Sequence, residues 1–183
     1  MTNRPTLSLD GEWDFSFTGA SARLDGPRTI RVPGVWQAHF AELRNSSGTG
    51  TYSRRVDVPV GWDSKRLFLV LEGVFHIARI TIDGRELVVH DNAWTPIEVE
   101  ITGVGASFAL SVAATVPDET DYAERGLGVM LAGKQDWYGL QGGIWKSVRL
   151  EGREPAHIAA LAVSASTDLA TLAVKLAGAL SSG

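Results

Sequence analysis

The chain has 183 residues, 44% hydrophobic and 21% charged, which is typical of a soluble globular protein with one domain and part of a second. A net charge of -4 without a lysine or arginine block gives no support to nucleic-acid binding, and the absence of cysteine excludes disulfides and thiolate chemistry. No apolar run approaches the roughly 18 residues of a membrane helix and no secretory signal opens the chain, so we expect no membrane contact and a cytoplasmic location, unless a leader was removed.

The first third of the chain predicts short β-strands. Residues 12–17 alternate polar with aromatic side chains, which is the period-two pattern of a half-buried strand. Residues 29–32 predict a second strand, which ends at the strong turn signal of Pro33 and Gly34. Residues 52–58 predict a third strand that ends before a proline.

The middle of the chain contains the clearest hairpin signal. Residues 67–71 are apolar on both faces, which indicates a central strand that is covered on both sides. Residues 78–82 carry apolar side chains on one face only. Asp83 and Gly84 join this strand to residues 86–90, and Asp-Gly between apolar runs predicts a type I′ turn, because both turn residues need a positive φ.

The remaining pattern indicates the fold class. Residues 97–101 and 107–114 predict another pair of strands, and no segment keeps a helical period for the 11 or so residues that a helix requires. Short strands separated by turns predict an all-β antiparallel sandwich. The regular spacing of strands and turns is interrupted at residues 116–143, a stretch of 28 residues that includes six glycines. A loop of this length in a compact domain is usually functional or disordered.

The chain closes with what we interpret as the start of a second domain. After a break at residues 152–155, residues 157–163 and 171–177 predict two strands. Two strands alone are not stable in water, so we divide the chain into a first domain, residues 1–152, and a truncated one, residues 153–183. Because unprotected strand edges pair with other chains, we expect the tail to be disordered or to join copies into a homo-oligomer.

Seven passages occur in a specific order: LDGEWDF at residues 9–15, VPGVWQ at 32–37, LEGV at 71–74, IDG at 82–84, HDNAWTP at 90–96, QDWY at 135–138 and GGIW at 142–145. In this order they resemble the N-terminal sugar-binding domain of glycoside hydrolase family two, the family of β-galactosidases, β-glucuronidases and β-mannosidases. The resemblance spans residues 7–151.

The resemblance implies a fold and a partner. The fold is a jelly-roll β-sandwich like galactose-binding domains, and residues 156–183 begin an immunoglobulin-like domain. In such enzymes both catalytic glutamates lie on a (β/α)₈ barrel, which this chain lacks, so the barrel of the same parent chain is an implied partner. Retaining hydrolysis needs two carboxyl groups about 5–5.5 Å apart. We therefore expect this chain to be inactive alone.

The stretch at residues 134–150 is the candidate sugar-binding site. Glycines favour irregular backbone in its first half, and its second half alternates as a strand does. Trp137 and Tyr138 present flat rings that either stack on a sugar or, for Trp137, plug the edge of the sandwich. Asp136 either accepts hydrogen bonds from sugar hydroxyls or serves as a turn residue. By the resemblance, this loop reaches toward the active site of the barrel.

Other candidate chemistry has less support. The acidic cluster of Asp118, Glu119, Asp121 and Glu124 lacks the spacing of a calcium loop and is better interpreted as a solvated loop. The histidines lack metal-ligand spacing, and neither a nucleophile elbow nor a phosphate loop is present. We predict no catalytic residue, no metal and no cofactor. The remaining tryptophans are interpreted as core or rim residues: Trp13, Trp36, Trp62, Trp94 and Trp145.

Three functions stay open at this point. The first is a non-catalytic sugar-binding domain of a retaining exo-β-glycosidase, which supports the barrel and forms one wall of its pocket. The second is a free-standing carbohydrate-binding module. The third is a purely structural assembly domain, in which Trp137 and Tyr138 would be buried.

Overall fold

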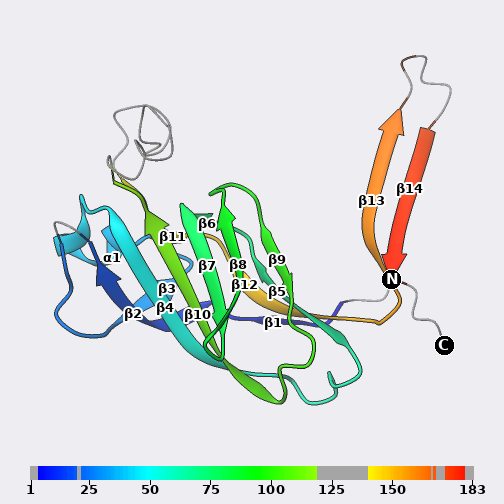
Figure 1. The fold of residues 1–183 in the computed structure, drawn as a ribbon, viewed down its shortest axis with the longest axis horizontal. Coiled ribbons are helices and arrows are strands. Elements are labelled where there is room, and N and C mark those ends of the chain that lie inside the picture. Colours follow the sequence, from blue (N-terminus) through cyan, green and yellow to red (C-terminus); the bar gives the residue numbers. More distant parts are fainter. Residues whose placement is uncertain (1–3, 20–21, 119–139, 166, 168–171, 180–183) are drawn as a thin grey trace.

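The computed structural model is a β-sandwich followed by a separate pair of strands (Figure 1). The described residues are 4–19, 22–118, 140–165, 167 and 172–179. Among them the helical segments are short, and none has the length and apolar character needed to span a bilayer. These segments are α1 (Trp36–His39) and the 3₁₀ turn η1 (Ala41–Leu43). The predicted all-β jelly-roll sandwich is therefore confirmed.

Two antiparallel sheets form the sandwich. The four-stranded sheet contains, in spatial order, β1 (Thr6–Ser8), β12 (Val148–Arg153), β5 (Arg66–Leu71) and β9 (Ile97–Glu100). The six-stranded sheet contains β3 (Arg28–Val32), β2 (Gly11–Thr18), β4 (Gly48–Asp57), β10 (Ser107–Val116), β7 (Ile77–Ile82) and β8 (Arg85–Asp91). Two short strands, β6 (Val74–Phe75) and β11 (Gly143–Ile144), pair with each other.

The core lies between the sheets and follows the predicted alternation. In β2 the three aromatic residues Trp13, Phe15 and Phe17 are buried, and the polar residues between them are exposed. Burying each such side chain stabilises the fold by roughly 1.5–3 kcal/mol. Strand β5 is central in its sheet and buried from Leu67 to Leu71, as its two-faced apolar sequence predicts.

The chain crosses from the first sheet to the second at Leu9 and Asp10. The backbone amide of Leu9 donates to the carbonyl of Val148 at 2.8 Å, and Asp10 Oδ1 accepts from the Val148 amide at 2.8 Å. The Leu9 carbonyl accepts from Trp13 Nε1 at 2.8 Å and from Arg54 Nη1 at 2.7 Å. These bonds satisfy the backbone at a buried crossover. They also tie the start of β2 to β12 in one sheet and to β4 in the other.

The hairpin between β7 and β8 is confirmed. Asp83 and Gly84 have φ values of 48° and 80°, both positive as a type I′ turn requires. Asp83 also ties the turn to β10, because its amide donates to the Ala109 carbonyl at 3.0 Å and its Oδ1 accepts from the Ala109 amide at 2.9 Å.

Two strand predictions were wrong in detail. Residues 97–101 and 107–114 do not pair with each other, because β9 joins β5 in one sheet while β10 lies between β4 and β7 in the other. Gly103 and Gly105, both with positive φ, lie on the connection between the two sheets. The strand predicted at residues 52–58 begins earlier than expected, at Gly48, because pairing with β10 satisfies the backbone of β4 regardless of side-chain pattern.

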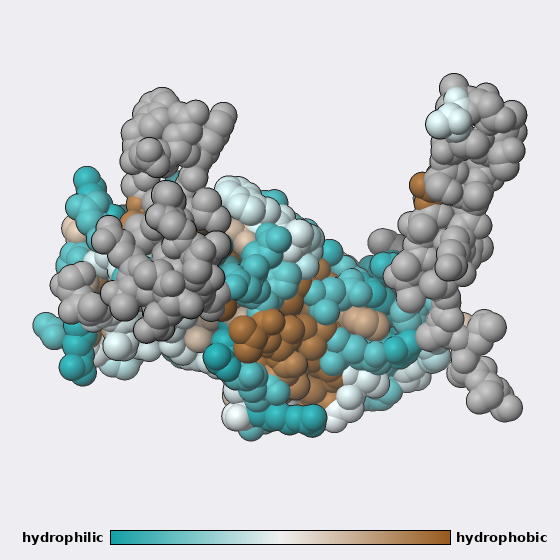
Figure 2. Space-filling view, turned by 45° about the horizontal axis from the view of Figure 1, so that its top comes forward, coloured by the Kyte–Doolittle hydropathy of each residue, from teal (hydrophilic) through white to brown (hydrophobic). Residues whose placement is uncertain are grey.

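The edge strands β8 and β9 lie at the same side of the sandwich, where apolar residues remain partly exposed. Leu87, Val88 and Val99 are half-buried, and Val89 is exposed. Figure 2 shows an apolar patch framed by hydrophilic residues on the face turned toward the viewer. The edge formed by β8 and β9 thus leaves several apolar side chains partly exposed to solvent.

The last two strands, β13 (His157–Ala165) and β14 (Leu172–Ala179), pair with each other in an antiparallel hairpin. In Figure 1 this hairpin, in orange and red, stands away from the sandwich. The two strands expected in this part of the chain are confirmed. Disorder of the tail, pairing between copies and the domain division at residue 152 stay predictions.

Candidate functional site

The predicted sugar contacts fall on a segment between two described strands. Asp136, Trp137 and Tyr138 lie outside the described residues, and so do three of the four acidic residues of the predicted cluster. The segment follows β10 and precedes β11. The described residues on either side therefore define where it leaves the sandwich and where it returns.

Both flanks of this segment are anchored beside β6. The amide of His76 donates to the carbonyl of Thr115, near the end of β10, at 3.2 Å. On the other flank, Gly143 of β11 pairs with Phe75 of β6. Strand β6 and the residue after it thus hold the two ends of the segment close together. We call this end of the sandwich the loop end.

Trp36 and Gln37, at the start of α1, hold the returning chain in place. The amide of Gly142 donates to Gln37 Oε1 at 2.9 Å, and its carbonyl accepts from the Trp36 amide at 3.1 Å. The Trp36 ring lies so close that a Cβ added to Gly142 would be 2.1 Å from a ring carbon. Only glycine fits here, which explains one of the glycines that mark this stretch in the sequence.

Buried aromatic rings of the core pack beneath the loop end, inside the sandwich. Phe15 lies 4.9 Å from Tyr52 in an edge-to-face contact, and Phe17 lies 5.3 Å from Trp36 in another. Burial raises the pKa of Tyr52 well above its usual value, and the backbone of Ile144 opposes this only in part. Tyr52 is therefore a buried packing residue that stays neutral at physiological pH.

An exposed aromatic residue forms the rim of the loop end. Trp94 is 64% exposed, and its ring meets Trp145 edge-to-face at 5.4 Å and Phe75 at 6.2 Å. Sequence reasoning grouped Trp94 with the core and rim residues. The signal that separates it from the buried tryptophans is local: Asn92 lies two residues before it and a proline two residues after it, as in an exposed turn.

The described groups at the loop end suit binding. Besides the rings, they include a hydroxyl pair, Thr49 Oγ1 and Thr115 Oγ1, at 2.8 Å, and the contact of His90 Nε2 with Thr95 Oγ1 at 3.0 Å. Within the described part of the chain, no three histidine, aspartate or glutamate side chains gather as metal ligands. Rings with hydroxyl and amide neighbours are the usual lining of a carbohydrate or other small-molecule site.

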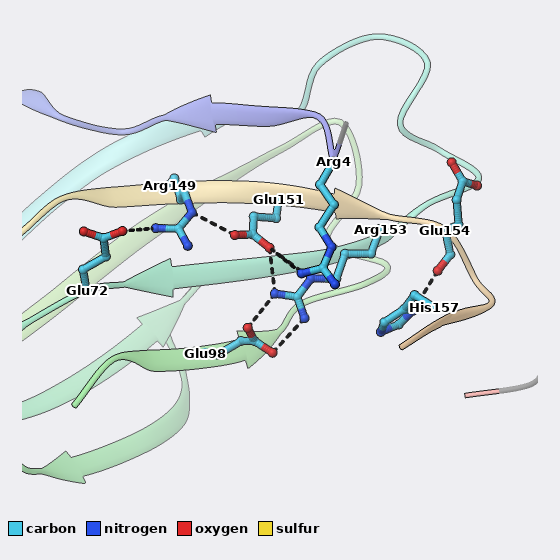
Figure 3. A network of polar contacts seen from close by, with 8 residues as sticks. All are labelled: Arg4, Glu72, Glu98, Arg149, Glu151, Arg153, Glu154 and His157. Atoms are coloured by element: carbon cyan, nitrogen blue, oxygen red, sulfur yellow. Dashed lines mark hydrogen bonds and ion pairs between the residues drawn. The ribbon is translucent and has the colours of Figure 1, made fainter. Parts of the chain in front are cut away.

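A different surface, the outer face of the four-stranded sheet, carries a network of charges (Figure 3). Arg153 lies between two carboxylates, with Nη2 2.5 Å from Glu98 and 2.7 Å from Glu151, and Arg149 Nε lies 2.8 Å from Glu151. The Arg153 guanidinium also lies 4.0 Å above the Phe68 ring. These charged side chains cover an aromatic residue that a sheet face would otherwise expose.

The network shifts the pKa values of its carboxyl groups. Hydrogen bonds from Arg153 lower the pKa of Glu98. Burial alone would raise the pKa of Glu151, but hydrogen bonds from Arg153 and Arg149 outweigh it and lower the pKa. At the edge of the same sheet, a hydrogen bond from Arg66 lowers the pKa of Glu100 to about 2. Carboxylates with lowered pKa values are held as ions in pairs, which suits stability better than acid catalysis.

Two hollows of the described surface lie at the end opposite the loop end. One of about 400 Å³ lies between the β7–β8 turn and residues 100–104. The other, of about 250 Å³, is lined by Trp62, Leu67 and residues 102–106. Neither includes a residue that flanks the segment with Asp136, Trp137 and Tyr138, so neither belongs to the predicted site.

Comparison with known proteins places these features in a family context. Residues 6–153 match the family model described as glycosyl hydrolases family 2, sugar binding domain. A β-glucuronidase of Bacteroides fragilis is 27% identical over 154 residues, which is 80% of this chain and 20% of that protein. The chain therefore spans about a fifth of the length of this curated relative.

Solved structures show the same fold. A β-glucuronidase from an uncultured Clostridium species matches with a TM-score of 0.76 and 22% identity, over 97% of this chain and 34% of that one. A β-galacturonidase from Eisenbergiella tayi, bound to galacturonate, matches with a TM-score of 0.67 and 24% identity, over 90% of this chain and 28% of that one. At these identities the likeness concerns the fold.

Proposed function

Because the chain belongs to the sugar-binding domain family of the family 2 glycosyl hydrolases, we propose that it is the non-catalytic sugar-binding wall of a retaining exo-β-glycosidase. The observation that carries the proposal is the family match over residues 6–153, which includes both sheets and the loop end. In this proposal a catalytic barrel from the same parent chain supplies the two carboxyl groups, about 5–5.5 Å apart, that retaining hydrolysis needs.

The geometry of the loop end supports this role. The segment that carries Asp136, Trp137 and Tyr138 leaves and rejoins a base fixed by β6 and by the bonds of Gly142 to Trp36 and Gln37. A binding segment on a rigid β-scaffold is a common way to build a recognition site. Asp136 accepts hydrogen bonds from sugar hydroxyls, and the two rings enclose the sugar that the barrel cleaves.

The relatives suggest the first substrates to test. The matched proteins include β-glucuronidases and a β-galacturonidase, so we propose β-linked hexuronosides as the substrate class of the parent enzyme. This chain contributes binding and orientation in that proposal, while the proton transfers and the covalent glycosyl intermediate belong to the barrel.

The test compares two proteins with p-nitrophenyl β-D-glucuronide as substrate. The 183-residue chain should release no nitrophenol, and the protein that includes the downstream barrel should release it. In the longer protein Asp136→Asn should lower kcat/KM by about 10- to 100-fold, the loss expected when a charged hydrogen-bond acceptor is removed. The matched control is Asp25→Asn, at an exposed turn residue. Hydrolysis by the short chain, or equal activity of both variants, would contradict the proposal.

A further inference from the structure

Trp94 is unusual among the tryptophans that the structure describes. Trp13, Trp36 and Trp62 are at most 8% exposed, whereas Trp94 is 64% exposed. A large ring left in water costs the protein the free energy that its burial would contribute. An exposed ring on an ordered loop is therefore a feature that calls for a ligand or partner, more than a single exposed aliphatic residue would.

The loop that carries Trp94 is fixed before any ligand binds. Asn92 Oδ1 accepts hydrogen bonds from the amides of Trp94, at 2.8 Å, and Thr95, at 3.2 Å. The hydroxyl of Thr95 lies 3.0 Å from His90 Nε2, and Ala93 is buried beneath the turn. Such a turn sets the position of the ring without restricting its contact with solvent.

The ring is also supported from the side. It meets Trp145 at an interplanar angle of 74° and Phe75 at 87°, the edge-to-face geometry that aromatic pairs prefer. Trp145 is itself held, since its Nε1 donates to the Ala93 carbonyl at 3.1 Å and Lys146 Nζ lies 4.5 Å from its ring centre. These contacts define the Trp94 platform: Trp94, with Trp145 and Phe75 as its supports.

We propose that the Trp94 platform is a second carbohydrate subsite, which stacks on the apolar face of a pyranose ring. A β-glucose-type ring has equatorial hydroxyl groups and axial C–H bonds, so its faces are apolar while its edge is polar. The surroundings of Trp94 match this, because the polar side chains of Asn92 and Thr95 lie on the same turn as the ring. Of the three rings of the platform only Trp94 is exposed, since Phe75 is buried and Trp145 is half-buried. A protein partner would instead favour a cluster of apolar anchors. The ligand class rests on the proposed sugar-binding function, but the site does not include Asp136, Trp137 or Tyr138.

The experiment uses the 183-residue chain labelled with ¹⁵N and titrated with methyl β-D-glucopyranoside. The indole N–H signal of Trp94 is identified by its loss in Trp94→Phe. We expect this signal to shift in a saturable way, with a dissociation constant in the millimolar range, since one stacked ring supplies little binding energy. Trp94→Ala should weaken binding at least about fivefold. Val60→Ala, which removes a fully exposed apolar side chain at the opposite end of the sandwich, should leave the affinity unchanged.

Further variants separate stacking from other effects. Asn92→Ala keeps the ring but removes the two bonds that fix its turn, so we expect weaker binding with an unchanged fold. Trp94→Phe, which keeps a smaller ring, should retain part of the affinity. Glycerol, which has hydroxyl groups and no ring face, should not reproduce the shift.

Three results would overturn the inference. They are a Trp94 signal that stays still while other signals move, a glycerol shift equal to that of the glycoside, and no shift at all with the glycoside. The proposed function survives each of them, because it assigns the sugar to the pocket assembled with the barrel. That function fails instead if the 183-residue chain hydrolyses the glucuronide, or if Asp136→Asn leaves the longer enzyme as active as its control variant.

Discussion

At the scale of single residues, aromatic rings at the loop end pack directly against glycines. A Cβ on Gly142 would strike Trp36, one on Gly50 would lie 2.7 Å from the Phe15 ring, and one on Gly73 would lie 2.8 Å from Trp145. Each glycine lets a ring pack directly against the backbone, where a side chain would leave no room for it. These residues therefore act as packing residues as well as turn residues.

Gly142→Ala should destabilise the protein by about 3 kcal/mol, because the new methyl group forces the Trp36 ring or the β11 backbone to shift in a filled core. The free energy of unfolding in urea, followed by circular dichroism, measures this. Gly105→Ala is the matched control, since it has a positive φ and open space around it. It should cost about 1 kcal/mol, from backbone strain alone. Equal losses in the two variants would show that Trp36 does not confine Gly142.

At the scale of elements, strand β12 has two different faces. Val148 and Leu150 point into the core, while Glu151 and Arg153 are buried on the outer face within the charged network of Figure 3. Buried ion pairs contribute little net stability, because desolvation offsets their attraction. Removing one partner is costly, however, since it leaves the other charge buried and unpaired. The network thus makes the sheet face sensitive to any change that neutralises one member.

Acid should therefore destabilise the sandwich through this face. The pKa values of Glu98, Glu100 and Glu151 are lowered in the folded protein, so each group stabilises the fold above its unfolded pKa of about 4.5. That contribution is lost as the pH falls from about 4.5 toward 2, the folded pKa of Glu100. Melting temperatures measured between pH 7 and pH 3 should fall steeply below about pH 4.5.

Arg153→Met identifies the source of this pH dependence. The variant should be less stable at neutral pH by roughly 3 kcal/mol, because Glu151 loses its main partner. It should also lose less stability in acid than the wild type, because protonation no longer breaks the pairs with Glu98 and Glu151. An unchanged acid slope would assign the pH dependence to other groups.

The sequence predicts an element well when the residues that determine its structure are neighbours along the chain. The β7–β8 turn was predictable, because Asp83 and Gly84 supply the positive φ values by themselves. The separation of β9 and β10 into opposite sheets was not, since it depends on long-range partners that no local pattern identifies. In the candidate site, the choice of residues 134–150 stays a prediction, and the structure explains one glycine of that stretch, Gly142, by its contact with Trp36. The role of Gln37 required the three-dimensional contacts, whereas the turn residues around Trp94 signal its exposure in the sequence itself.

At the scale of the whole molecule, the sandwich and the final hairpin are different kinds of structure. The family match ends at Arg153, and the strands of the hairpin pair with each other in a sheet of their own. The sandwich contacts the start of β13 through the ring of His157, which lies 5.7 Å from Phe68, and Lys65 pairs with Glu154 at 2.5 Å. A two-stranded sheet has two unpaired edges, which are open to pairing with another chain.

Deleting residues 158–183 should leave the sandwich intact and remove self-association. The shortened chain keeps the contacts of Glu154 and His157, so its melting temperature should stay within about 3 °C of that of the full chain. Sedimentation velocity over a range of concentrations should show dimers or larger species of the full chain and only monomers of the shortened one, because the hairpin edges supply the contact. A full chain that stays monomeric would remove the proposed homo-oligomer. A drop of 10 °C or more on deletion would mean that the hairpin is part of the folding unit that residues 1–152 were expected to form alone.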